Sequence, residues 1–239
     1  MLQAQQQSSP QNSSDFVHPT VIRHGTFLGV SQPLRDIAAA KQNYVEIQSE
    51  KEEEEMELNG ELAVRSYPYY TPSGPDPVWQ KFMPQTKATT NLILNFSGQS
   101  SPYYPSDCNG QVGLNYYMQG VNSSYAIYDK SGNLVVASTA FNTLFSGVTG
   151  SSNNDGDIIV LYDDNAQRWF ASEFDISDAN NMQMIAVSVT GDPTGSWYKW
   201  SFDVDDMPDY GKFGIWEDGY YFADNNSGGT DVYVFERSV

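Results

Sequence analysis

Two acidic segments carry side chains whose type and spacing suit a hard cation. The candidate ligands are Asn153, Asp155 and Asp157 in NNDGD, and Asp203, Asp205 and Asp206 in DVDDMPD. Carboxylate and amide oxygens are the ligands that Ca²⁺ prefers, so Ca²⁺ is the one cofactor these segments suggest. Neither segment follows the EF-hand pattern, and Asx-turns with solvated acids are the alternative interpretation. The glycine within NNDGD permits a sharp bend and favours the first segment.

Carboxylates also permit glycoside hydrolysis, in which two acidic groups flank the bond that breaks. Asp157, Asp209 and Glu173 are candidates for this role if they point into a common channel. Such a site would show carboxylates that converge, with at least one raised pKa. A binding site for sugar or protein would instead show an exposed aromatic platform.

Charge and composition exclude several other functions. The net charge of −18 argues against nucleic acid and against an anionic membrane surface, since both repel acids. Only Arg168 and Arg237 follow residue 86, so the arginine cluster that holds a sialidase substrate is not expected; we interpret Arg168 as part of a surface ion pair. No His follows His24, which excludes His-based catalysis in the predicted folded part. Cys108 is the single cysteine; no intramolecular disulfide can form, and we expect a buried thiol.

The first 85 residues are expected to be largely a disordered or linker segment. Residues 1–20 are rich in Gln and Ser, and residues 49–61 form an acidic run, both typical of solvated chain. Residues 21–41 have enough apolar side chains for a short docking segment. No apolar run is long enough to span a membrane, and no signal-peptide pattern opens the chain.

Short strands joined by Gly-, Asn- and Asp-rich turns are predicted from about residue 86 onward. Aromatic and β-branched residues recur there, and long helical patterns do not. The predicted strands are 91–98, 115–122, 123–130, 133–141, 157–163, 168–174, 182–190, 197–204, 212–218, 219–225 and 231–237.

These strands repeat with a period near 50. Aligning Asp157 with Asp209 places Trp169 on Tyr221, and the same step back from Trp169 reaches Tyr117. Four short antiparallel strands per repeat predict an all-β fold, an incomplete β-propeller of four-stranded antiparallel blades preceded by a disordered acidic tail. The expected propeller region is 86–239, with blades at about 107–141, 155–204 and 209–239. We expect the predicted strand at 91–98 to close the ring with a last blade that this chain lacks, so that the chain is the front part of a longer protein.

The turn after the third strand of a repeat carries Asp-x-x-Gly twice. The predicted structural turn residues are Asp129 and Gly132, then Asp192, Gly195, Ser196 and Trp197. The short carboxylate of Asp192 is expected to accept hydrogen bonds from the following backbone N–H groups. Gly195 would permit a positive φ, and Trp197 would pack between blades.

The stretch TGDPTGSW resembles the Asp box of sialidase-type propellers. Thr190, Asp192, Ser196 and Trp197 match that pattern, whereas the glycine is displaced by one position. More widely, SDCNGQVGLNYYMQGVN, NDGDIIVLYDDNAQRWFASEF and the sequence that follows resemble a family of large secreted bacterial propeller proteins, many of them type IX secretion cargo. This resemblance covers residues 91–239 and implies a secreted or cell-surface location. It implies no reaction, and the Asp box of sialidases lies away from their catalytic centre.

The function expected from these observations is a non-catalytic extracellular scaffold or recognition module that binds a glycan or a protein. The alternative is a propeller glycoside hydrolase acting on extracellular polysaccharide, with an active site completed by further blades. No Gly-rich phosphate loop, Ser/His/Asp set or Cys/His zinc pattern is present in the sequence.

Overall fold

The computed structural model describes residues 19–41, 93–100, 106–148, 151, 153–175, 181–204, 206–226 and 229–237. Within these ranges the chain forms twelve strands, one α-helix and one 3₁₀-helix, at Phe141–Thr143. The all-β class expected from the short alternating strands is therefore confirmed. All strand pairs are antiparallel.

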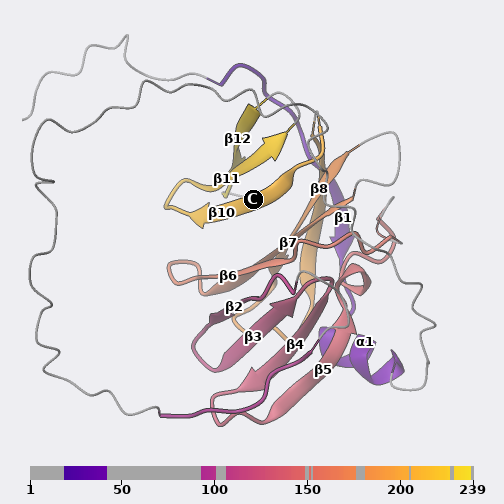
Figure 1. Ribbon diagram of the computed structural model, residues 1–239, viewed down its shortest axis with the longest axis vertical. Helices are drawn as coiled ribbons and strands as arrows, with labels where there is room; N and C mark the ends of the chain where they lie inside the picture. The colour runs from indigo at the N-terminus through magenta and orange to yellow at the C-terminus, as the bar shows by residue number, and fades with distance from the viewer. Residues whose placement is uncertain are drawn as a thin grey trace, which may run out of the picture.

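The strands form three sheets that follow one another along the chain (Figure 1). The first sheet has the order β2 (Asn109–Val112), β3 (Tyr116–Val121), β4 (Ser124–Asp129) and β5 (Leu134–Ala140). The second contains β6 (Ile159–Asp163), β7 (Arg168–Asp175), β8 (Met182–Ser188) and β9 (Trp197–Asp203), with β1 (Thr26–Val30) added beside β9. The third consists of β10 (Asp209–Ile215), β11 (Gly219–Asn226) and β12 (Gly229–Glu236).

The second sheet lies between the other two, and strand β7 explains why. Alternate side chains of a strand point to opposite faces, and β7 is apolar on both. Trp169 and Ala171 join the core cluster shared with the first sheet, which also contains Met118 and Ile127. Phe170 instead joins a smaller cluster with the third sheet. The two clusters hold the three sheets together as a stack (Figure 1).

The region upstream of the repeats contributes an extra strand and a helix, which sequence analysis did not predict beyond a docking segment at 21–41. Strand β1 pairs with β9, with Phe27 opposite Trp200. Helix α1 (Leu34–Lys41) then brings Leu34 and Ala38 into the larger core cluster. Leu34 is fully buried, so this upstream segment contributes to the hydrophobic core of the fold.

Two predictions about the repeats are corrected. Residues 93–98 of the predicted strand 91–98 form no strand; they lie against the first sheet, where the ring of Phe96 is 5.0 Å from that of Tyr128. The alignment of Trp169 with Tyr221 is also wrong by one residue. Trp169 faces the preceding sheet, whereas Tyr221 is exposed on the far side of its sheet and Tyr220 faces the preceding one. A shift of one residue exchanges the faces of a strand. No closed sheet occurs in the described ranges.

Candidate functional site

The three sheets bring one aspartate each to the start of their first strands. Asp107 lies just before β2, Asp157 just before β6, and Asp209 opens β10. Strand β6 contacts both β2 and β10, so these three strands form one edge of the stack. Positive φ angles at Asp107 (37°), Asp157 (51°) and Tyr210 (52°) bend the chain as it enters each strand. We call Asp107, Asp157 and Asp209 the inner-edge aspartates.

Asp157 interacts electrostatically with each of the other two inner-edge aspartates. The pKa of Asp157 is raised to about 6, mainly by burial and then by the negative charges of Asp107 and Asp209. Lys212 and a backbone hydrogen bond from Tyr210 act in the opposite direction. A carboxyl group with a pKa near neutrality can exchange protons at physiological pH.

An exposed tyrosine stands beside this group. Tyr210 follows Asp209 directly, and 65% of its surface is exposed. The Nζ atom of Lys212 lies 3.5 Å from the centre of its ring and donates to the backbone carbonyls of Tyr210 (3.3 Å) and Gly211 (3.0 Å). An aromatic ring next to carboxylates is a combination that stacks on a sugar ring and accepts hydrogen bonds from its hydroxyls.

The first predicted Ca²⁺ segment is divided between two places. Asp157 belongs to the inner-edge aspartates, whereas the charge of Asp155 acts on Glu173, a fully buried acid of β7. Asn153 donates from Nδ2 to Asp175 Oδ1, at 3.3 Å. The structure therefore links the loop to a buried acid on a strand. From the sequence, Glu173 is a candidate only for a catalytic acid, together with Asp157 and Asp209.

The second predicted Ca²⁺ segment is also dispersed. Asp203 ends β9, where its backbone carbonyl accepts a hydrogen bond from Arg23 at 3.1 Å. Asp206 Oδ1 accepts from the Met207 amide at 2.8 Å, and Asp205 lies outside the described residues. Within the described ranges, no three Asp, Glu, His or Cys side chains form a group that could hold a metal ion.

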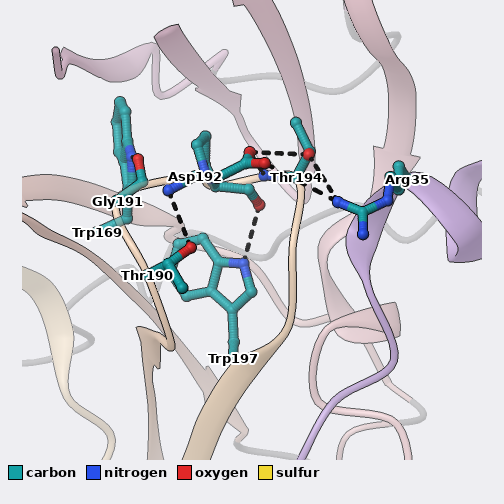
Figure 2. A network of polar contacts seen from close by, with 8 residues as sticks. Arg35, Trp169, Thr190, Gly191, Asp192, Thr194 and Trp197 are labelled. Carbon is teal, nitrogen blue, oxygen red and sulfur yellow. Dashed lines mark hydrogen bonds and ion pairs between the residues drawn. The ribbon is translucent and has the colours of Figure 1, made fainter. Parts of the chain in front are cut away.

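The TGDPTGSW turn is held by a network of hydrogen bonds that also connects it to helix α1, as Figure 2 shows. Asp192 Oδ1 accepts from the Thr194 amide (2.9 Å) and from its hydroxyl (2.8 Å), and Trp197 Nε1 donates to the Pro193 carbonyl (3.0 Å). Arg35 of α1 donates to Thr194 Oγ1 at 3.3 Å and lies 3.9 Å from Asp192 Oδ2. Trp169 Nε1 of β7 donates to the Gly191 carbonyl of the turn at 3.1 Å. The partners in this network therefore come from the turn itself, from β7 and from the docked helix, so the turn organises the fold.

The turn prediction is confirmed at Asp129 and Gly132 but is wrong about the backbone angle of Gly195. Asp129 accepts hydrogen bonds from the Ser131 (2.8 Å) and Asn133 (2.9 Å) amides, and Gly132 has a φ of 82°. Gly195 has no positive φ, so that prediction is wrong. Its amide instead donates to the Asp192 carbonyl, at 3.2 Å.

Ser196 and Trp197, the last two residues of the turn, also make contacts that hold it in place. The Ser196 carbonyl accepts from the Val189 amide at 2.9 Å, which closes the hairpin between β8 and β9. Trp197 is fully buried in the core cluster shared by the first and second sheets. Its backbone amide donates to Ser31 Oγ at 3.0 Å, which attaches the upstream segment.

The predictions of a buried Cys108 thiol and of an ion pair at Arg168 both need correction. Cys108 is exposed rather than buried. Arg168 donates to the carbonyls of Ala166 and Gln167. The ion pair in this region belongs to Arg237, whose Nε lies 2.7 Å from Asp163 Oδ2.

Comparisons with known proteins give no relative from which a function can be transferred. No family model, curated protein or solved structure matches the chain.

The described residues contain no helix that is both long and apolar enough to cross a membrane.

Proposed function

We propose that this chain is a non-catalytic recognition module of a propeller-type protein, located outside the cell, that binds a glycan at the inner-edge aspartates. The observation that carries this proposal is the position of Tyr210, a largely exposed tyrosine that follows Asp209 directly and whose backbone hydrogen-bonds Asp157. The stacked antiparallel sheets and the resemblance to secreted bacterial propellers support the architecture and the location.

The chemistry of the surface favours a neutral or amino-substituted glycan. The inner-edge aspartates would repel uronic or sialic acids, whereas they accept hydrogen bonds from hydroxyl or amino groups. Tyr210 supplies a flat apolar face for the sugar ring. Lys212, held by two backbone carbonyls, keeps the tyrosine in place.

Binding is tested by affinity electrophoresis through neutral and acidic polysaccharides, followed by calorimetry with oligosaccharides. We expect Tyr210→Asn to abolish retardation, because Asn keeps the left-handed backbone angle but lacks the ring. Tyr221→Asn is the matched control, since Tyr221 is an exposed tyrosine on β11 that hydrogen-bonds Asp218. Equal retardation of both variants and the unchanged chain would rule out the Tyr210 surface.

A second candidate function, glycoside hydrolysis, is favoured by one observation. Asp157 has a pKa of about 6, which suits a general acid, and two further carboxylates lie nearby. Release of reducing ends from a bound polysaccharide, lost in Asp157→Asn while binding persists, would establish an enzyme. Binding without release supports the recognition module.

A further inference from the structure

Glu173 is the most unusual acidic residue of the described chain. It is fully buried in β7. Neither of its carboxylate oxygens makes a well-formed hydrogen bond with a described residue, and the one donor that acts on the group is the backbone amide of Gly156. Burying a carboxylate with so little hydrogen bonding is costly, so a group of this kind requires either a proton or a cation.

The surroundings of Glu173 are acidic. Besides burial, the charges of Asp155 and Asp175 raise its pKa, and only the amide of Gly156 lowers it. Lys199, the buried cation of the same sheet, donates to the Ser146 carbonyl at 2.8 Å instead. No described basic side chain bonds Glu173.

The loop that approaches Glu173 is built to turn sharply. Asn154 and Gly156 have φ angles of 55° and 113°. Asn153 reaches Asp175 through its amide nitrogen, at 3.3 Å. The loop thus places the carboxylate of Asp155 and the amide group of Asn153 beside the acids of β7, and carboxylate and amide oxygens are ligand types that Ca²⁺ takes.

The same arrangement recurs 51 residues later. Asp206 in the next inter-sheet loop corresponds to Asp155, and Asp224 of β11 corresponds to Glu173. Asp224 is 3% exposed, and its pKa is raised to about 6, mainly by burial and then by the charges of Asp231 and Asp206. A buried strand acid beside a loop aspartate is therefore a feature of the repeat.

We propose that the junction between the loop at 153–157 and the end of β7 binds a Ca²⁺-type cation, with Glu173 as its buried ligand. Asp155, Asp175 and the Asn153 amide oxygen are the neighbouring donors. They do not form a ready group of three acidic ligands, so backbone carbonyls and water complete the shell, as is usual for Ca²⁺. The ion would tie the inter-sheet loop to the second sheet.

The proposal is tested by thermal unfolding of the full chain at pH 7 and constant ionic strength, in millimolar CaCl2 or in EDTA. We expect CaCl2 to raise Tm by at least about 4 °C, and Glu173→Gln to lose this rise. Asp164→Asn, which removes an exposed acid elsewhere in the second sheet, should retain it. Tb³⁺ luminescence, displaced by Ca²⁺, reports binding directly.

Three outcomes would overturn the proposal. They are an unchanged Tm in CaCl2, the same rise in Glu173→Gln as in the parent chain, and a Glu173→Gln variant more stable than the parent in both buffers. The last result would mean that Glu173 carries a proton. If Glu173→Gln does not fold, Asp155→Asn in the partly exposed loop must weaken Tb³⁺ binding.

Discussion

At the scale of single residues, Asp157 should make stability depend on pH. Its folded pKa of about 6 lies above the ordinary value of 3.8, so folding favours the protonated form. The stabilisation is complete below about pH 4 and disappears as pH rises through 6. We expect Asp157→Asn to raise the free energy of unfolding at pH 7 by about 1 to 3 kcal/mol, measured by urea denaturation. The variant should also show a smaller decrease between pH 4 and pH 6, whereas Asp164→Asn should keep the full decrease.

Asp192 gives a second prediction at this scale. Asp192→Ala removes the acceptor of two hydrogen bonds from Thr194 and should lower the free energy of unfolding by about 1 to 3 kcal/mol. Asp192→Asn keeps an acceptor oxygen and should retain most of the stability. If the alanine variant matches the parent chain in urea denaturation, the hydrogen bonds of Asp192 to Thr194 do not stabilise the folded chain.

At the scale of elements, helix α1 should be required for full stability. Leu34 is fully buried in the larger core cluster, so Leu34→Ala leaves a cavity and should cost about 2 to 5 kcal/mol. Ile22→Ala is the control, because Ile22 is 77% exposed in the same upstream segment and its loss should change stability by less than about 0.5 kcal/mol. Equal urea midpoints for the two variants would show that α1 is not part of the cooperative fold.

At the scale of the whole molecule, the sheets should differ in local stability. The second sheet is covered on both faces, whereas the third packs through one face and exposes Tyr221, Val232 and Val234 on the other. Local opening is easier where fewer apolar contacts are buried. We expect amides of β10–β12 to exchange with deuterium faster than those of β7 and β8 in mass-spectrometric measurements. Slower exchange in the third sheet would indicate that its outer face is covered in solution.

The sequence by itself determined most of the strands downstream of β2, their antiparallel order and the Asp129 turn. Alternating apolar residues and Asp- or Gly-rich turns are local signals, so β3 to β9 and the Asp129 turn follow from neighbouring residues. The segment 93–98 was misassigned for the same reason. Its apolar residues predict a strand, but Phe96 packs against Tyr128 with tilted rings, a contact that no local pattern encodes.

Only the tertiary structure decided which acids meet. Asp155 and Asp157 are only two residues apart, but the positive φ of Gly156 turns the chain between them. As a result, the charge of Asp155 acts on Glu173, whereas Asp157 interacts with Asp107 and Asp209. Asp107, Asp157 and Asp209 meet because their strands stack edge beside edge, a long-range arrangement. The one-residue shift at Tyr221 has a similar origin, since which face of a strand is buried depends on the sheet that covers it.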